Sequence, residues 1–164
     1  MKVLVTGGSG FVGMALLKCL VDNSRYHVVA ALRKNSVSVP VGENVYIDDI
    51  CEHTDWSSAL AGIETVIHIA ARNHVMNDVA NDQPTEFRCI NVDGTINLAK
   101  QSASAGVKRF IFISSIKVNG EETYPGQPFR STDTSNPWDA YSVSKCEAEQ
   151  KLTKLAEETG MEIV

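Results

Sequence analysis

The sequence has few of the residues that build disulfide frameworks or metal centres. Its 164 residues include four cysteines and four histidines, and no CxxC pair or Cys/His pair has metal-ligand spacing. We therefore expect no metal site. We also expect reduced thiols, as in a cytoplasmic protein, because disulfides persist mainly in oxidising compartments. The cysteines are Cys19, Cys51, Cys89 and Cys146.

The sequence also lacks a surplus of basic residues and any long apolar run. Fifteen Lys and Arg against twenty Asp and Glu give a net charge of −5. Without a basic surplus to meet phosphates in bulk, we expect no nucleic-acid partner and no acidic membrane surface. The apolar run after Lys2 stops at Gly7, which is too short for a signal peptide, and no stretch approaches membrane-spanning length.

Two catalytic signatures are missing as well. The sequence contains neither the nucleophile pattern G-x-S-x-G nor the phosphate-loop pattern G-x-x-x-x-G-K-[ST]. Their absence argues against a hydrolase of that type and against a kinase.

What is present is an alternation of apolar runs and helix-period segments. The predicted strands are Lys2–Thr6, His27–Leu32, Asn44–Ile47, Glu64–Ile69 and Arg109–Ser114, and the predicted helices are Gly10–Asp22, Asp55–Ala61, Glu86–Ala105 and Ala140–Thr159. Most strands are unbroken apolar runs, which is typical of a parallel sheet covered on both faces. We therefore expect a doubly wound α/β domain of Rossmann type, with three αβα layers. Residues 72–84 and 119–137 are predicted to be irregular.

The chain ends on residues that resemble the opening of a further strand. Met161–Val164 follows Gly160, a residue type that commonly ends a helix. We therefore expect residues 1–164 to be a fragment of a longer protein.

The glycine-rich segment TGGSGFVG, at Thr6–Gly13, directly follows the first predicted strand. Gly8, Gly10 and Gly13 fit G-x-G-x-x-G, whereas Gly7, Gly10 and Gly13 fit G-x-x-G-x-x-G. A strand, a glycine turn and a helix N-terminus form an anion site, because free N–H groups and the helix dipole face the ligand. This predicts a bound dinucleotide; the alternative is a glycine-rich turn without a ligand.

The end of the second predicted strand bears on which dinucleotide binds. NAD enzymes usually have an acid there for the ribose 2′-hydroxyl, but this sequence has Leu32, Arg33 and Lys34. Arg33 favours NADP slightly, because a guanidinium pairs with a 2′-phosphate. The alternative is that these cations are solvated loop charges. After the third strand, Asp49 and Ile50 are candidates to contact the adenine.

Three residue types suggest an acid–base centre. Tyr141 and Lys145 lie four positions apart in the last predicted helix and so share one face. A nearby ammonium favours the phenolate, which suits tyrosine to proton transfer near neutral pH. Ser114 and Ser115 follow the fifth predicted strand, at the sheet edge where ligands bind. Ser115 would hydrogen-bond a substrate hydroxyl or carbonyl. The alternative is that the serines only cap the strand end.

Together these segments resemble the extended short-chain dehydrogenase/reductases, specifically the NAD(P)-dependent epimerase/dehydratase group that acts on nucleotide sugars and includes the UDP-glucose 4-epimerases. The resemblance extends over essentially the whole chain. It rests on TGGSGFVG at 6–13, DDI at 48–50, VIHIAA at 66–71, NVDGTINL at 91–98, FISSIKVNG at 112–120 and YSVSK at 141–145.

The resemblance implies a role for each matching residue. Ser115, Tyr141 and Lys145 would be the catalytic triad. The cofactor-binding set would be Gly7, Ser9, Gly10, Phe11, Val12, Gly13, Arg33, Asp49, Ile50, Ala70, Ala71, Asn91, Ser114, Tyr141 and Lys145. Gly7, Gly10 and Gly13 are then the working glycines, and Gly8 is expected to provide backbone freedom in the turn. Asn91 would support the active site from its helix.

The resemblance implies an enzyme that transfers a hydride at C4 of a UDP-linked sugar through a 4-keto species, with NAD or NADP as cofactor. SSIKVNGE is more similar to enzymes of surface-polysaccharide synthesis, so an NADPH-dependent 4-keto-sugar reductase is one alternative. A non-catalytic NAD(P)-binding sensor is another. Family members often form a homodimer through the helix bearing the tyrosine, and they carry a C-terminal substrate domain. We thus expect residues 1–164 to be the cofactor domain, inactive alone.

Overall fold

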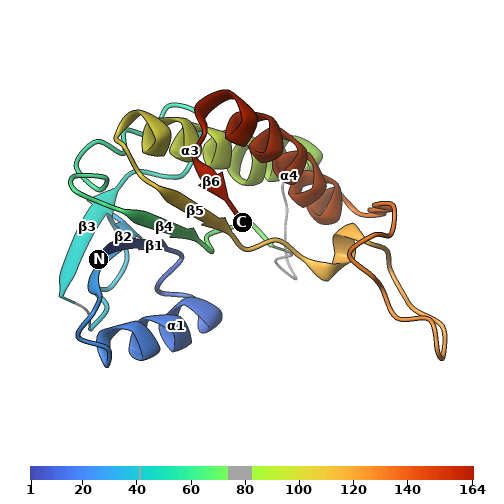
Figure 1. The fold of residues 1–164 in the computed structure, drawn as a ribbon, viewed down its shortest axis with the longest axis horizontal. Helices are drawn as coiled ribbons and strands as arrows, with labels where there is room; N and C mark the ends of the chain where they lie inside the picture. The colour runs from blue at the N-terminus through green and yellow to red at the C-terminus, as the bar shows by residue number, and fades with distance from the viewer. Residues whose placement is uncertain (41, 74–82) are drawn as a thin grey trace.

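The computed structural model describes residues 1–40, 42–73 and 83–164 and contains a six-stranded sheet (Figure 1). The strands are β1 (Lys2–Thr6), β2 (His27–Arg33), β3 (Glu43–Ile47), β4 (Thr65–His68), β5 (Arg109–Phe112) and β6 (Glu162–Ile163). Their order is β3-β2-β1-β4-β5-β6, and every neighbouring pair is parallel. The strand order reverses between β1 and β4, which confirms the doubly wound fold and places the ligand crevice at their carboxyl ends.

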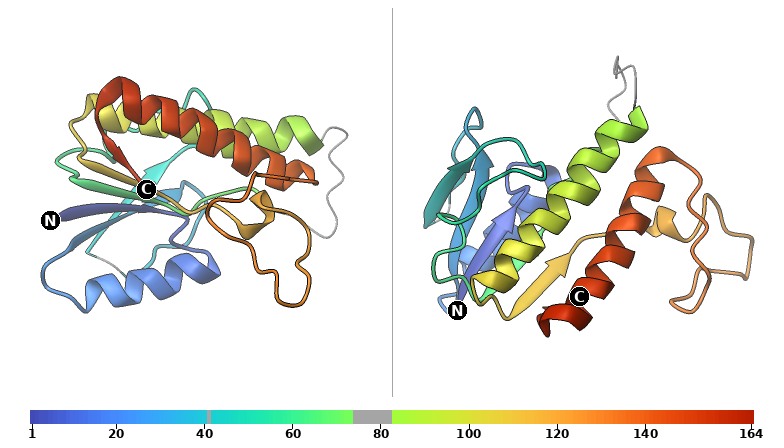
Figure 2. Two further views of the ribbon diagram at one scale, coloured as in Figure 1. Left: turned by 45° about the vertical axis from the view of Figure 1, so that its right-hand side comes forward. Right: turned by 90° about the horizontal axis from the view of Figure 1, so that it is seen from above.

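Helices cover both faces of the sheet. They are α1 (Phe11–Val21), α2 (Gln83–Arg88), α3 (Thr95–Ser104) and α4 (Ala140–Thr159), with a π-helical segment η1 (Cys89–Gly94) and a 3₁₀ turn η2 (Ile116–Val118). Helix α1 lies on one face, and α3 and α4 run next to each other across the other (Figures 1 and 2). The expected three-layer arrangement is therefore confirmed.

Alternating side chains of β1 point into two separate cores. Val3 and Val5 pack with Leu17 of α1 on one face. Leu4 packs on the other face with residues of α3 and α4, among them Leu98 and Leu152. Burying each such side chain contributes about 1.5–3 kcal/mol. This two-sided burial is the physical reason why the strands read as unbroken apolar runs.

The helix predicted at Asp55–Ala61 is wrong. The segment forms hydrogen-bonded turns, with one helical bond from Leu60 N to Trp56 O at 2.9 Å. The Trp56 N–H instead donates to Gln101 Oε1 of α3 at 2.9 Å. Nucleating a helix is costly, so tertiary contacts decide the conformation of such a short segment. Here the deciding contact is the packing of Trp56, which is fully buried in the core.

The helix predicted at Glu86–Ala105 is present but is not uniform. The helical region begins earlier than predicted, at Gln83. Its middle part, Cys89–Gly94, is π-helical, and the spacing of the apolar residues did not predict this. The irregular segment predicted at 72–84 falls mostly outside the described residues, and its last two positions are helical.

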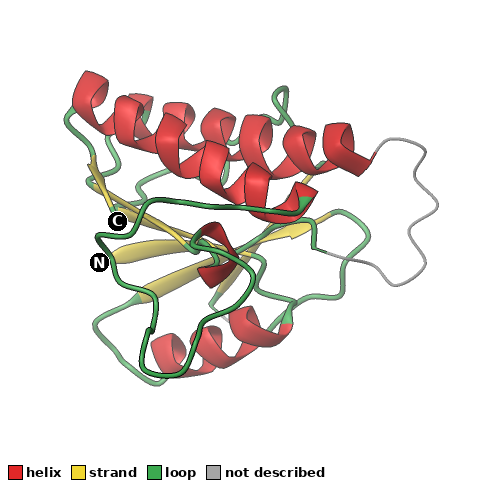
Figure 3. Ribbon diagram, turned by 90° about the vertical axis from the view of Figure 1, so that its right-hand side faces the viewer, coloured by secondary structure: helices red, strands yellow, loops and turns green. Residues whose placement is uncertain are grey.

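The long segment between η2 and α4 is irregular, as predicted, apart from an isolated bridge between Tyr124 and Gln127 (Figure 3). Strand β5 ends at Phe112, two residues earlier than predicted, so Ser114 and Ser115 lie in the loop beyond it.

Candidate active site and cofactor site

The turn between β1 and α1 requires glycine at two positions. Gly7 has a φ of +73°, and a Cβ there would lie 2.7 Å from Ala70 N. At Gly13 a Cβ would lie 2.1 Å from Gly7 O. Gly10 N donates to Gly7 O at 3.0 Å, and a Cβ at Gly10 would lie 3.3 Å from that oxygen. This geometry favours the pattern made by Gly7, Gly10 and Gly13.

The expectation for Gly8 is wrong. Gly8 does not have a positive φ, so backbone freedom is not what requires glycine there. A Cβ at Gly8 would instead lie 2.8 Å from Leu17 Cδ1. Glycine at this position lets α1 pack closely on the sheet.

The first turn of α1 is left open for a ligand. Its N-cap residue is Gly10, which has no side chain to accept from the free N–H groups, and the first turn contains no acid. Ser9, Phe11 and Val12 are exposed beside it. Unpaired N–H groups at the positive end of a helix dipole suit a phosphate.

At the carboxyl ends of β2 and β3, the two predicted cations are paired with acids. Arg33 Nη1 lies 3.6 Å from Asp49 Oδ1, and Lys34 Nζ lies 2.6 Å from Asp48 Oδ1. These residues line a pocket of about 450 Å³ together with Asn35, Ser36 and Ile47. Arg33 is therefore not the unopposed cation that the sequence suggested.

The loop after β3 is held against the π-helical segment. A Cβ on Gly94 would lie 2.6 Å from Ile50 Cγ2 and 3.2 Å from Cys51 N. Asn97 Nδ2 donates to Cys51 O at 3.1 Å. Close approach at Gly94 thus holds Ile50, one of the two predicted adenine contacts.

The end of β4 is tied to the end of β1 through a buried histidine. Thr6 Oγ1 accepts from Ala70 N at 3.2 Å and lies 2.7 Å from His68 Nδ1, while His68 Nε2 lies 2.9 Å from Thr95 Oγ1. Complete burial lowers the pKa of His68 to about 3, and the Lys145 charge adds to this. Neutral His68 therefore holds the Thr6 hydroxyl that accepts from Ala70, just beyond the end of β4.

Asn91 joins that loop to the helix carrying the catalytic candidates. Its Oδ1 accepts from Arg72 N at 2.8 Å, and its Nδ2 donates to Arg72 O at 2.9 Å and to Ser144 Oγ at 3.0 Å. Ser144 Oγ in turn donates to Tyr141 O at 2.6 Å. The buried Asn91 thus supports α4 from η1, in the position that the resemblance implied.

Ser114 and Ser115 follow β5, beside the crevice at the carboxyl edge. The Ser114 hydroxyl is buried and has no hydrogen-bond partner among the described residues. Ser115 Oγ accepts from Lys117 N at 3.3 Å, and through this hydrogen bond Ser115 caps the start of η2. The Ser115 hydroxyl proton is not used by this cap, because Oγ is the acceptor.

Tyr141 lies in the first turn of α4, where its ring is held by packing. The Phe87 ring meets it edge-on, with centroids 6.1 Å apart. Asp139 caps the helix by accepting from Ser142 N at 2.6 Å, and Ser142 Oγ accepts from Asp139 N at 3.1 Å. This reciprocal cap fixes where α4 begins and hence where Tyr141 points.

Lys145, one turn after Tyr141, is buried with only 1 % of its surface exposed. Its Nζ lies 3.9 Å from the centroid of the Phe112 ring and makes no hydrogen bond or ion pair to the described residues. Burial lowers its pKa to about 8. A buried cation without an anionic partner is costly, so its place at the crevice calls for a functional explanation.

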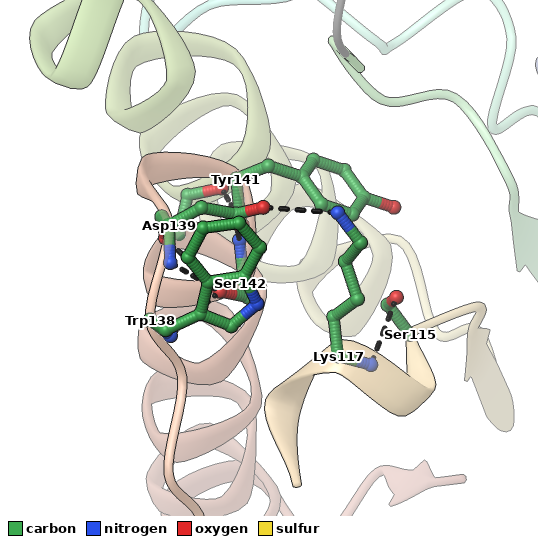
Figure 4. Close-up of polar contacts among 7 residues, drawn as sticks. Ser115, Lys117, Trp138, Asp139, Tyr141 and Ser142 are labelled. Carbon is green, nitrogen blue, oxygen red and sulfur yellow. Dashed lines mark hydrogen bonds and ion pairs between the residues drawn. The ribbon is translucent and has the colours of Figure 1, made fainter. Parts of the chain in front are cut away.

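The ion pair between Lys117 and Asp139 was not predicted from the sequence. Lys117 Nζ donates to Asp139 Oδ2 at 3.0 Å and lies 5.4 Å from the centroid of the Trp138 ring. Figure 4 shows the Lys117 side chain reaching from η2 to the start of α4, flanked by Ser115 and Tyr141. The sequence around Lys117, SSIKVNG, contains nothing that predicts its contact with Asp139. Asp139 itself could have been predicted as an N-cap residue, because it lies three residues before Ser142 at the start of a helix.

The described residues fit a dinucleotide. The glycine turn leaves room where a Cβ would clash, and the first turn of α1 has no side-chain cap. Ser114 Oγ is buried without a hydrogen-bond partner in the described chain, and the buried Lys145 makes no ion pair there. No group of three or more His, Cys, Asp or Glu side chains in the described ranges is placed to hold a metal ion. Nor does any helix among them have the length and apolar character needed to cross a membrane.

Comparison with known proteins agrees with this geometry. UDP-glucose 4-epimerase of Vibrio cholerae is 47% identical over 163 residues, covering 99% of this chain and 49% of the relative. A 3-beta-hydroxysteroid dehydrogenase of Mycolicibacterium neoaurum is 33% identical over 172 residues, covering 98% of this chain and 44% of the relative. The chain thus spans about half the length of the curated relatives it matches.

A solved structure shows the same fold. The UDP-glucuronic acid 4-epimerase of Bacillus cereus, in complex with UDP-glucuronic acid and NAD, superposes with a TM-score of 0.82 at 27% identity, covering 100% of this chain and 55% of that protein. The family model of the NAD dependent epimerase/dehydratase family matches residues 3–164. The chain therefore belongs to the NAD dependent epimerase/dehydratase family.

Proposed function

We propose that the complete protein is an NAD-dependent 4-epimerase of a UDP-linked sugar. The observation that carries this proposal is the buried, unpaired ammonium of Lys145, one helical turn from Tyr141 at the same edge of the sheet as Ser115. A binding module has no use for a costly buried cation beside a phenol, so this arrangement favours an enzyme over a sensor. The 47% identity to a UDP-glucose 4-epimerase supports the choice of substrate class.

The residues proposed to hold the cofactor follow the ends of β1, β3, β4 and β5, apart from Asn91 in η1 and Lys145 in α4. The N–H groups after Gly10 would take the pyrophosphate, Asp49 and Ile50 would flank the adenine, and Ala70, Ala71, Asn91 and Ser114 would border the nicotinamide half. Lys145 would hydrogen-bond the nicotinamide ribose. When bound, NAD supplies a hydride acceptor at C4 of the sugar.

Tyr141 and Ser115 are proposed to handle the proton. Ser115 Oγ would hydrogen-bond the sugar 4-hydroxyl, and Tyr141, as phenolate, would remove its proton while the carbon loses hydride to give the 4-keto sugar. The Lys145 charge would stabilise that phenolate. After the keto sugar has rotated in the site, C4 would regain the hydride on its opposite face and the 4-oxygen would regain its proton from Tyr141, which completes the inversion and restores the oxidised cofactor.

The choice of an epimerase over a reductase rests on Arg33. In the sequence, Arg33 slightly favoured NADP and with it the alternative of a reductase, but Asp49 lies 3.6 Å from its guanidinium. A carboxylate at this place repels a 2′-phosphate and can accept from a ribose hydroxyl. We therefore propose NAD, retained and regenerated in each cycle.

We further propose that residues 1–164 are the cofactor domain of a two-domain enzyme. We also propose a homodimer in which α4 contributes to the interface, which sedimentation of the complete protein would test. A cytoplasmic location is proposed from the four free thiols, Cys19, Cys51, Cys89 and Cys146.

The test is incubation of the complete protein with a panel of UDP-sugars, following product stereochemistry and NADH absorbance. We expect a C4 epimer to form with no net change in NADH. Net consumption of NADPH would contradict the epimerase. Tyr141→Phe should abolish turnover while NAD binding, followed by fluorescence, is retained. An active Tyr141→Phe variant would contradict the role of the phenol.

A further inference from the structure

We infer that Lys117 and Asp139 are a positioning pair that sets the spacing between Ser115 and Tyr141. The inference rests on the proposed function, because it concerns the residues proposed to handle the sugar hydroxyl. Neither residue is expected to touch the substrate. They act by joining the two segments that carry the catalytic side chains.

Lys117 contacts both segments. Its backbone N–H donates to Ser115 Oγ at 3.3 Å, so it is part of the turn that orients the serine. Its side chain leaves η2 and donates to Asp139 Oδ2 at 3.0 Å, two residues before Tyr141 (Figure 4). A single residue thus connects the serine to the start of the catalytic helix.

Asp139 is well placed to transmit this link. Only 9 % of its side chain is exposed, and its other carboxylate oxygen caps α4 by accepting from Ser142 N at 2.6 Å. The carboxylate therefore holds the first turn of α4 with one oxygen and η2 with the other. A shift of Lys117 would shift the helix start and the Tyr141 ring with it.

Two further contacts oppose movement of the pair. The Lys117 ammonium lies 5.4 Å from the centroid of the Trp138 ring, within the range of a cation–π interaction. Asn136 N also donates to Val118 O at 2.9 Å, which ties the chain before α4 to the end of η2. The ion pair and the cation–π contact are made by side chains, whereas the Asn136–Val118 bond is made by the backbone, so substitution of Asp139 can remove the ion pair without altering the backbone.

The test is a double-mutant cycle in the complete protein, with Lys117→Met, Asp139→Asn and both together. Met keeps the apolar stem, and Asn remains a good N-cap while losing the charge that Lys117 needs. We expect each single variant to lower kcat roughly ten- to a hundredfold, because small misplacements of reacting groups have effects of this size. The double variant should lose no more than one single variant, because the pair acts as a unit.

Two further measurements accompany the cycle, and they distinguish a positioning role of the pair from a purely structural one. The affinity for NAD should stay within about twofold of wild type, so that the loss falls on kcat. Lys117→Arg, which keeps the charge, should recover most of the rate. Lys151→Met is the matched control on α4, because Lys151 pairs only with Asp93 and Glu147 at 3.7 and 3.2 Å among the described residues, away from η2.

The inference is overturned if the single variants keep wild-type kcat, if their losses add in the double variant, or if Lys117→Arg is as impaired as Lys117→Met. A wild-type protein without turnover would refute the proposed function instead. In that case NMR of carbon-labelled tyrosine tests the pair directly, with the Tyr141 signal assigned by its absence in Tyr141→Phe. A shift of that signal in Lys117→Met but not in Lys151→Met supports the pair, and an unchanged signal overturns it.

Discussion

The ammonium of Lys145 lies 3.9 Å from the centroid of the Phe112 ring, so that the end of β5 and the first half of α4 meet through a cation and an aromatic face. The ring provides the charge with a weak partner in a site from which water is excluded. It does not replace the lost hydration, and burial holds the pKa of Lys145 at about 8. This balance between function and stability gives the first prediction.

Replacing Lys145 with Met should stabilise the fold and abolish turnover. The pKa of Lys145 is lowered from 10.5 to about 8, so below pH 8 the folded state holds a charge that costs a few kcal/mol. Between pH 8 and 10.5 the unfolded state binds more protons, and wild-type stability rises with pH. The gain from Lys145→Met, measured by urea unfolding, should therefore be largest at pH 7 and vanish near pH 10.5.

Lys151→Met is again the control, because 37 % of the Lys151 side chain is exposed and its removal relieves no buried charge. A Lys145→Met protein less stable than wild type at pH 7 would show that the ammonium is favourably paired.

His68 should make the fold sensitive to acid. Its pKa is lowered from 6.5 to about 3, so between these values the unfolded state binds more protons than the folded state. Stability should therefore fall as the pH drops from 6.5 to 3, by up to a few kcal/mol. His68→Gln keeps a donor and an acceptor for Thr6 and Thr95 without titrating. Its unfolding free energy should change less over this range; an equal slope would contradict the assignment.

Gly13→Ala should damage both the fold and cofactor binding. Its Cβ would lie 2.1 Å from a backbone oxygen, so the turn must move, at a cost of about 2–3 kcal/mol. We expect a lower midpoint of thermal unfolding and NAD affinity reduced at least about tenfold. Gly42→Ala is the control, because its Cβ would meet Val28 O at 3.7 Å, an ordinary contact. Equal behaviour of the two variants would refute the role of the turn.

Asp49→Asn should shift cofactor preference toward NADP. The substitution removes the charge that faces Arg33 at 3.6 Å and leaves the guanidinium free to meet a 2′-phosphate. The measure is the ratio of NADP to NAD affinity by titration calorimetry, since loss of an adenine contact would weaken both alike. Asp48→Asn, which unpairs Lys34, is the matched control. A ratio unchanged by Asp49→Asn would show that Arg33 does not read the 2′ position.

Several features were predictable because they depend on local chemistry. The glycine pattern after an apolar run predicted a strand-to-helix turn at Thr6–Gly13. The structure gives the reasons for the glycines, which are the φ of +73° at Gly7 and the close approach at Gly13. Tyr141 and Lys145 were placed on one helix face by the helical period. The position of Asn91 followed from the family resemblance and agrees with its contacts to Arg72 and Ser144. The catalytic and cofactor roles of these residues remain predictions.

The errors arose where distant segments decide the conformation. Asp55–Ala61 has a helical pattern, but Trp56 is held by the core and Gln101, so it forms turns. Gly8 is required by Leu17, a neighbour nine positions later in α1. The sequence suggests a free cation at Arg33, but Asp49, from the loop after β3, lies 3.6 Å from it. In each case the deciding partner comes from a different element.

By itself the sequence determined the parallel doubly wound sheet, the glycine turn and the residue types of the proposed catalytic centre. These features depend on the spacing of apolar residues, on the stereochemistry of glycine and on the spacing of residues within one helix. Each acts over a few neighbouring residues, so one sequence is enough to predict it. Only the tertiary structure decided which charges are paired, that Lys145 is buried against Phe112, and that Lys117 links Ser115 to Asp139. Burial and ion pairing depend on groups brought together by the fold, and no local pattern carries that information.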